Sequence, residues 1–204
     1  MDLLASQLLC RVPRVEHGFG TRTSAFEQDG FASLRQIHSA RWIAACTPGP
    51  AGEGDALITN VPSLGVSIRT ADCLPILLAD PVKCAVAAVH AGWRGTAARI
   101  VAETIGAMQR QYGTRPEDLM VAIGPGIGAC CYRVGEDVGR RFGLNGPGFV
   151  DLAKENRRQL VETGVPEPQI DVLGFCTFCD GRRFHSFRRD GERAGRMISF
   201  IRML

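Results

Sequence analysis

The chain has 204 residues, of which 45% are hydrophobic and 22% are charged. This composition is typical of an ordinary globular protein with enough apolar side chains for one substantial core. The formal net charge of +3 comes from arginines spread along the chain, without a basic block of the kind that follows a phosphate backbone, so we expect no nucleic-acid partner. No apolar run approaches the roughly 20 residues that a membrane span needs. We therefore expect one catalytic domain over residues 1–204, with no membrane association.

The N-terminal segment and the cysteines indicate a cytoplasmic protein. Residues 1–11 lack the basic stretch that precedes the apolar part of a secretory signal, and a first strand or helix is expected there. The eight cysteines are then interpreted as reduced thiols, because disulfide frameworks belong to small secreted domains without an adequate core. We expect some of these thiols to be buried and at least one to bind a metal.

The first half of the chain predicts a loop followed by buried strands. Residues 47–54 (TPGPAGEG) have the prolines and glycines of a loop. After the segment DALIT, short apolar runs bounded by Pro, Asp and Gly predict strands at residues 64–69, 74–79 and 85–90. Apolar side chains then recur at helical spacing over residues 96–112, which predicts a helix with Thr96 as its N-cap.

The second half continues the alternation of strands and helices. A strand predicted at residues 119–123 leads into the segment GPGIG, where a turn is expected because the proline breaks the dinucleotide-binding pattern. Asp151 is the expected cap of a helix that runs to residue 162 and ends at Gly164. Strands are expected at 170–175 and 184–187, and residues 194–203 fit either a strand or a short helix. The result is a mixed α/β domain.

Three side chains from separate segments carry metal-binding chemistry. The chain has four histidines; His38 and His90 lie next to predicted strand ends, and Cys73 lies between two strands in the segment TADC. Three protein ligands with one open position are typical of catalytic zinc sites, whereas structural sites close all four positions. The alternative is that Cys73 is a small buried apolar residue and that both histidines are satisfied polar groups of the core.

Six stretches of the sequence together resemble the YfiH family, formerly labelled as polyphenol oxidoreductase or laccase domain proteins; they are RQIHSARW, GDALIT, TADCLPILLAD, AAVHAGWRGT, IGPGIGACCYRVGEDV and CTFCDGRRFHSFRRDGERAGR. The resemblance runs in order from about His17 to the C-terminus. It implies a layered α/β/β/α sandwich and a zinc ion bound by His38, Cys73 and His90. It also implies phosphorolysis of adenosine, inosine and methylthioadenosine, with accompanying adenosine deamination. Copper is a weaker alternative to zinc, and the resemblance leaves the oligomeric state open.

This sequence departs from the family pattern in two places. The segment from His17 to Arg22 is followed by TSAF and a short bridge, where family members usually have a Gly-Gly-Val-Ser turn and a longer insertion. His185 stands where the family usually has an aromatic residue. We expect the first difference to trim the substrate pocket, and the second to affect either substrate choice or packing.

Several charged residues are further candidates for the site. Asp72 has two alternative roles. It either orients a histidine ligand or carries a proton, as carboxylates near metals do, or it is only a turn residue. Asp55 has the same alternatives, and for it the structural role is favoured. Four arginines are candidates to bind phosphate, because guanidinium groups match phosphate oxygens in charge and shape. These are Arg94, Arg69, Arg188 and Arg22.

The sequence leaves competing interpretations of its cysteines open. Cys176 and Cys179 have CxxC spacing, but there is no second such pair and Cys130 and Cys131 are adjacent, so a zinc knuckle or redox motif is not favoured.

The main alternative to a zinc phosphorylase is a hydrolase of small peptide-like substrates, with Cys73 as nucleophile and His90 as base. A multicopper oxidase is rejected because four histidines are too few. A structural module would need a fourth protein ligand on the zinc.

Overall fold

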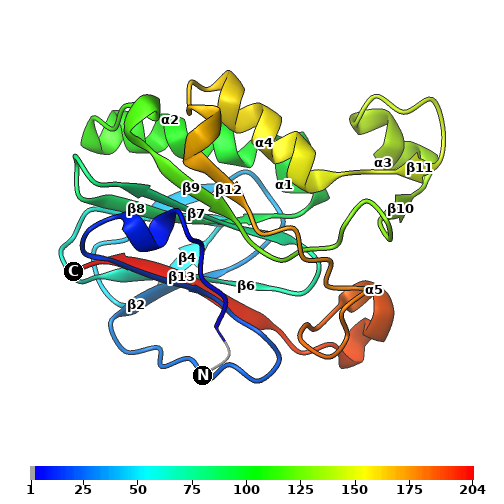
Figure 1. Ribbon diagram of the computed structural model, residues 1–204, viewed down its shortest axis with the longest axis horizontal. Coiled ribbons are helices and arrows are strands. Elements are labelled where there is room, and N and C mark those ends of the chain that lie inside the picture. The colour runs from blue at the N-terminus through cyan, green and yellow to red at the C-terminus, as the bar shows by residue number, and fades with distance from the viewer. Residues whose placement is uncertain (1–2) are drawn as a thin grey trace.

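The structure is a computed structural model that describes residues 3–204. Within these residues two β-sheets lie face to face, and helices α1, α2 and α4 cover the outer face of one of them (Figure 1). The strand order is β1-β13-β6-β2-β4 in the five-stranded sheet and β12-β9-β7-β8-β5-β3 in the six-stranded sheet. No helix of this part of the chain reaches the length and apolar character that a bilayer crossing requires.

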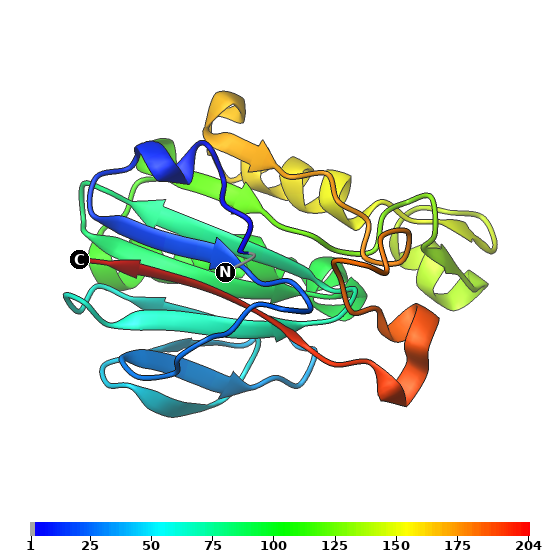
Figure 2. The same ribbon diagram turned by 60° about the horizontal axis from the view of Figure 1, so that its bottom comes forward.

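The five-stranded sheet comprises β1 Val15–Phe19, β2 Phe31–Arg35, β4 Gly49–Glu53, β6 Gly65–Thr70 and β13 Met197–Met203. The six-stranded sheet comprises β3 Trp42–Ala44, β5 Ala56–Thr59, β7 Leu74–Asp80, β8 Ala85–Ala91, β9 Met120–Ile123 and β12 Ile170–Val172. A small two-stranded antiparallel sheet pairs β10 Arg133–Val134 with β11 Gly148–Phe149. The helices are α1 Trp93–Ala97, α2 Ile100–Tyr112, α3 Glu136–Arg141, α4 Leu152–Glu162 and α5 Phe187–Asp190. In Figure 2, α3 and α5 lie at the same end of the sandwich.

Alternation along the central strands produces two apolar cores. In β7, Leu77 belongs to the core between the two sheets, whereas Ile76 and Leu78 belong to the core between the six-stranded sheet and the helices. Successive side chains of a strand point to opposite faces, and here both faces are covered. This explains why residues 74–79 and 85–89 are apolar throughout, and both predicted strands are confirmed.

The expected mixed α/β class is confirmed, and so is the stacking of two sheets with a helical layer on the six-stranded one, but the second helical layer of the expected α/β/β/α sandwich is not found among residues 3–204. On the outer face of the five-stranded sheet, the covering element among the described residues is an extended segment rather than a helix. Phe26 of that segment packs against Phe31 of β2 and Phe200 of β13, with ring centroids 4.9 and 5.3 Å away. The predicted strand at 119–123 and the helix capped by Asp151 are also confirmed, and Asp151 Oδ1 accepts a hydrogen bond from the Lys154 N–H.

The predicted loop at residues 47–54 was wrong. The chain there forms β4, which pairs in parallel with β2 across an irregularity between Ser33 and Arg35. Because β4 is the edge strand of its sheet, it tolerates Pro50, which has no N–H to donate.

The single helix predicted over residues 96–112 is two helices, α1 and α2. The chain breaks between them at Arg99, whose φ of 59° is left-handed. Thr96 is therefore not an N-cap but a buried residue of α1, held by hydrogen bonds from the Asn156 and Gln159 side chains of α4. The kink is thus stabilised by tertiary contacts that local periodicity does not record.

Three expectations near the chain ends are corrected or resolved. Residues 184–187 form no strand; Phe184 is buried in a turn, and Ser186 caps the short helix α5. The strand predicted at 170–175 ends at Val172, where its pairing with β9 ends. The segment 194–203 contains strand β13, and the N-terminal segment contains a 3-10 helix at Leu9–Arg11, with residues 1–2 outside the described part.

Candidate metal centre and its pocket

Two of the three predicted ligands lie where the chain crosses from one sheet to the other, and the third lies near the end of a strand. His38 is on the connection from β2 to β3, and Cys73 is on the connection from β6 to β7; each of these links the five-stranded to the six-stranded sheet. His90 is near the end of β8, just before α1. Rigid strands on both sides of each connection therefore hold these side chains at one end of the sandwich.

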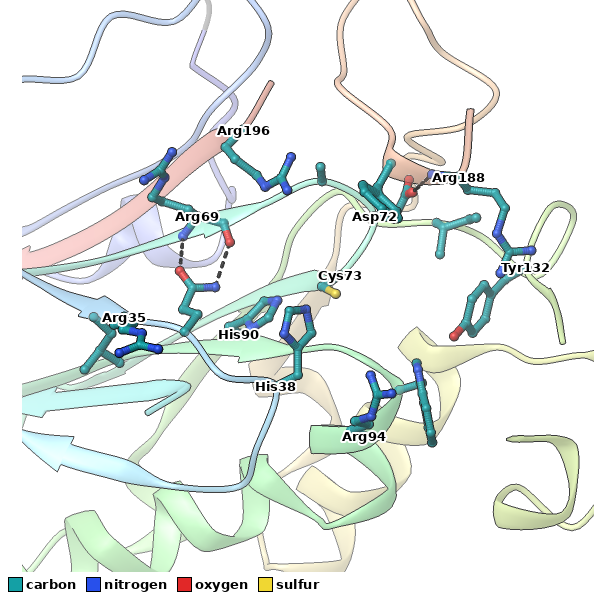
Figure 3. A pocket seen from close by; sticks show the side chains of 16 residues that line it. Arg35, His38, Arg69, Asp72, Cys73, His90, Arg94, Tyr132, Arg188 and Arg196 are labelled. Atoms are coloured by element: carbon teal, nitrogen blue, oxygen red, sulfur yellow. Dashed lines mark hydrogen bonds between the residues drawn. The ribbon is translucent and has the colours of Figure 1, made fainter. Parts of the chain in front are cut away.

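The structure brings the three side chains together. One ligand atom from each of His38, Cys73 and His90 lies within 4.8 Å of the others, and the three side chains converge in Figure 3. The imidazole rings are nearly perpendicular, with centroids 4.8 Å apart. Gly92 makes room for this arrangement, because a Cβ atom there would lie 2.8 Å from Cys73 Sγ.

One buried carboxylate positions both imidazoles. Asp55 Oδ1 accepts hydrogen bonds from His90 Nδ1 at 2.8 Å and from the His38 backbone N–H at 2.9 Å. Asp55 Oδ2 accepts from the backbone N–H and the hydroxyl of Ser39. These bonds hold His38 in a left-handed backbone conformation, with φ 58°, which costs a non-glycine residue free energy and persists only where its surroundings stabilise it. They also leave His90 Nε2 as the nitrogen available for a metal.

The hydrogen bonds shift the protonation of all three interacting groups. Burial opposes the ionisation of Asp55, but bonds from His90 and Ser39 outweigh it and lower its pKa to about 2. Burial likewise opposes the charged form of His90, but Asp55 and Cys73 raise its pKa to about 9. Burial raises the pKa of Cys73, and the stronger effect of His38 and His90 lowers it to about 7. A thiol that ionises near neutral pH readily becomes a thiolate ligand.

Asp72 contacts other groups than the ligand histidines. Its carboxylate accepts hydrogen bonds from the Thr177 hydroxyl at 2.7 Å and from the Arg188 backbone N–H at 2.6 Å. Its own backbone is left-handed, with φ 85°. Asp72 therefore joins Thr177 and the start of α5, through hydrogen bonds, to the connection that carries Cys73. Asp55, and not Asp72, orients a ligand histidine.

The metal-ligand cluster forms part of the wall of a pocket of about 720 Å³, a size within the usual range for small-molecule sites. Of the four predicted phosphate-binding arginines, Arg94, Arg69 and Arg188 line this pocket. Arg22 is not among its lining residues; its guanidinium lies 3.8 Å from Asp190 and donates to the carbonyls of Gly181 and Phe184. The pocket is rich in guanidinium groups on the sides away from the ligand cluster (Figure 3).

Sequence reasoning missed several pocket residues. Arg196 lines the pocket, and Tyr132 forms part of its wall with the Arg188 guanidinium 5.1 Å from its ring centroid. Burial, and then the nearby Cys73 thiol, raise the pKa of Tyr132 to about 12. Both residues stand in motifs that carried the resemblance, but nothing in their local spacing marks them as pocket residues.

The remaining histidines and the glycine-rich segment lie around this centre. His17 Nε2 accepts a hydrogen bond from the Ser6 N–H, and His185 packs over Gly195, where a Cβ atom would lie 2.5 Å from its Nε2. Neither is among the pocket-lining residues. The turn expected at the GPGIG segment was wrong: Gly126 there forms a bridge with Cys176, Ile127 lines the pocket, and the turn follows at residues 129–131.

A zinc knuckle at the CxxC pair is not favoured by the sequence, which contains no second CxxC pair, but the fold brings two further cysteines to it. Cys130 and Cys131 meet Cys176 and Cys179, and one sulfur atom from each lies within 4.8 Å of the others. The bridge between Gly126 and Cys176 brings the two segments together across about 50 residues of sequence. A pairing over that separation is decided by the fold and has no local signal.

Comparison with known proteins identifies the family. Residues 19–204 match the model of a family described as "Multi-copper polyphenol oxidoreductase laccase". A relative from Bacteroides thetaiotaomicron named "Purine nucleoside phosphorylase" is 40% identical over 161 residues, which are 72% of this chain and 60% of the relative. A second, "Adenosine deaminase RL5" from an unknown prokaryotic organism, is 37% identical over 161 residues, 72% of this chain and 61% of the relative. The match thus spans about three fifths of the length of these relatives.

Solved structures agree with the sequence matches. A crystal structure of the hypothetical protein YfiH from Bacillus licheniformis superposes with a TM-score of 0.89 at 27% identity, covering 95% of this chain and 94% of that one. This chain belongs to the YfiH family, whose sequence model is described as a multi-copper polyphenol oxidoreductase laccase domain.

Proposed function

We propose that this chain is a zinc-dependent purine nucleoside phosphorylase that acts on adenosine, inosine and methylthioadenosine through one catalytic domain spanning residues 1–204. The observation that carries the proposal is the convergence of His38, Cys73 and His90 at the wall of an arginine-lined pocket. The names of relatives support the same reaction class.

The donor set fits zinc. Two imidazoles and a thiol within 4.8 Å of one another are typical ligands of zinc, and three protein ligands leave a coordination position for water or substrate. Asp55 holds His90 in the tautomer that presents Nε2, as carboxylates next to metal-bound histidines commonly do. Zinc bound there supplies a Lewis acid at the pocket wall.

The arginines provide the binding site for the second substrate. In phosphorolysis a phosphate oxygen bonds to C1′ of the ribose while the C1′–N9 bond breaks, and its electron pair leaves with the purine, which takes up a proton. Arg94 and Arg188 lie on the pocket wall, where guanidinium groups hold phosphate oxygens through paired hydrogen bonds. Tyr132 Oη is protonated at neutral pH, as a tyrosine hydroxyl ordinarily is, and burial and Cys73 raise its pKa further, to about 12. We assign to this hydroxyl the donation of a hydrogen bond or proton to the leaving purine.

Adenosine deamination is the second candidate activity, and the name of one relative favours it. It would use the same pocket. In this reaction a water-derived oxygen adds at purine C6 and ammonia leaves, and the base is otherwise unchanged. The literal laccase activity is not favoured by the histidine content: of four histidines, His17 and His185 lie outside the pocket, and a multicopper oxidase needs more imidazole ligands. The thiolate hydrolase alternative is not favoured by the names of the relatives.

A phosphate-dependence assay tests the proposal. Base release from adenosine, inosine and methylthioadenosine is measured with and without phosphate, together with ammonia release from adenosine. We expect base release to require phosphate and to be lost in Cys73→Ala, with Cys46→Ala as the matched control because Cys46 is an exposed cysteine outside the pocket. Tyr132→Phe is expected to lower kcat while the zinc content stays unchanged. Product formation that ignores phosphate, or full turnover in Cys73→Ala, would reject the phosphorylase assignment.

A further inference from the structure

Four cysteines outside the pocket cluster gather where two distant segments meet. Cys130 and Cys131 lie in the turn that follows the GPGIG segment, and Cys176 and Cys179 lie in the turn that precedes α5. The two turns are joined at the isolated bridge between Gly126 and Cys176. All four side chains are at least partly accessible to solvent, so an ion can reach them without any opening of the core.

The spacing of the sulfur atoms fits one tetrahedral metal ion. All four lie within 4.8 Å of one another, and Cys179 Sγ is 3.6 Å from Cys130 Sγ and 3.3 Å from Cys131 Sγ. Tetrahedral zinc with Zn–S bonds of about 2.3 Å places its sulfur ligands about 3.8 Å apart. A disulfide would require a separation of about 2.05 Å. The measured distances therefore match ligands around a shared ion more closely than a bonded sulfur pair.

A backbone donor supports one of these sulfur atoms. The N–H of Gly128 donates to Cys176 Sγ at 3.2 Å. Hydrogen bonds from neighbouring groups orient metal ligands and favour their charged form. Cys176 Cβ is also 3.3 Å from the position that a Cβ of Gly128 would occupy, so the glycine permits this close approach.

We propose that Cys130, Cys131, Cys176 and Cys179 bind a second zinc ion in a closed structural site. Four thiolates satisfy the coordination of zinc completely, which separates this site in kind from the three-ligand cluster in the pocket. Zinc is preferred to a harder cation because thiolate ligands select soft or borderline metals. The proposal does not rest on the phosphorylase assignment, since the four cysteines are not among the pocket-lining residues.

The second ion would tie together two walls of the pocket. Ile127 and Tyr132 flank the first pair of cysteines and line the pocket. Thr177, between the second pair, donates to the Asp72 carboxylate next to Cys73, and Arg189 of α5 donates to the Thr177 and Phe178 carbonyls. A metal that joins these two turns would limit their freedom to move apart, since metal binding contributes directly to folding free energy.

Metal analysis of the intact protein tests the proposal. Protein produced with zinc and purified without chelators is expected to contain two zinc ions per chain, one for each cluster. We expect one ion in Cys176→Ser, one in His90→Ala, and two in the matched control Cys10→Ser, because Cys10 is exposed and outside both clusters. One ion in the wild type together with one in Cys176→Ser would overturn the proposal, as would iron in place of zinc.

Cobalt substitution gives a readout that does not depend on the folding of a cluster variant. In Cys73→Ala the pocket cluster has no sulfur ligand, and among the described residues the four cysteines are the remaining group that could bind one ion through sulfur, so an intense sulfur-to-cobalt charge-transfer band is assigned to them. We expect an intense band of this kind with the strong visible absorption of tetrahedral cobalt. Absence of the band overturns the second site. So does peptide mapping of the metal-free wild type that finds a disulfide between two of these four cysteines, because the paired sulfur atoms could not then bind the ion.

Discussion

Replacement of Asp55 by Asn tests whether one carboxylate positions both imidazoles. The side chain of Asp55 is fully buried and accepts from His90 Nδ1, from the backbone N–H groups of His38 and Ser39, and from the Ser39 hydroxyl. Asn keeps one oxygen and replaces the other with an NH₂ group, so at least one N–H donor loses its acceptor. If the amide nitrogen faces His90, the imidazole must carry its hydrogen on Nε2, and that nitrogen can no longer bind a metal.

The magnitude follows from the same contacts. Losing one buried hydrogen bond to a charged group costs about 1.5–3 kcal/mol. The lowering of the pKa of Asp55 from 3.8 to about 2 corresponds to about 2.5 kcal/mol, at about 1.4 kcal/mol per pKa unit. For a chain of this length we expect the melting temperature of the metal-free protein to fall by roughly 5–10 °C. The zinc affinity should fall by about 10–100-fold, as it does when an outer carboxylate is lost.

The pH dependence of this stabilisation has a defined sign. Because the pKa of Asp55 is lower in the folded than in the unfolded protein, its contribution is complete above about pH 4 and is lost as the pH falls through about 2. Asn cannot ionise, so the difference in unfolding free energy between wild type and Asp55→Asn should shrink over that window.

Zinc affinity is measured by competition with a chromophoric chelator, and stability by thermal unfolding of the metal-free protein. Asp118→Asn is the matched control, because its carboxylate pairs with Arg115 at the surface, where ion pairs contribute about 0–1 kcal/mol. If Asp55→Asn kept both the zinc affinity and the melting temperature of the wild type, the argument that Asp55 positions the two imidazoles would be refuted.

Three further outcomes follow from single contacts. Gly92→Ala should weaken zinc binding in competition titrations without unfolding the chain, because the new Cβ would lie 2.8 Å from Cys73 Sγ; unchanged affinity would show that the sulfur moves freely. Arg94→Ala should raise KM for phosphate by about 10–100-fold through loss of a charge-assisted contact. Arg22 is not among the pocket-lining residues, so Arg22→Ala should leave KM for phosphate unchanged. Equal effects of the two substitutions in steady-state kinetics would contradict the assigned phosphate site. Leu77→Ala, fully buried between the sheets, should lower the unfolding free energy in urea by about 2–5 kcal/mol, and a loss below that range would mean that the core closes around the gap.

The sequence by itself determined the elements whose signals are local. The apolar runs at β7 and β8 predicted strands because both of their faces are buried, and Asp151 marked the start of α4 through its own side-chain oxygen. It also singled out His38, Cys73 and His90, since metal-binding side chains are few and their positions at strand ends stand out.

Tertiary structure decided what depends on residues distant in sequence. Helical periodicity continues through Arg99, but the hydrogen bonds from α4 to Thr96 stabilise a break there. Asp55 and Asp72 look alike in sequence, and only the fold shows that Asp55 meets the histidines whereas Asp72 meets Thr177. Cys130 and Cys176 become neighbours through the bridge at Gly126. Such pairings depend on how the sheets stack and the connections cross, and a local sequence pattern contains no record of which distant groups will share a buried or metal-binding position.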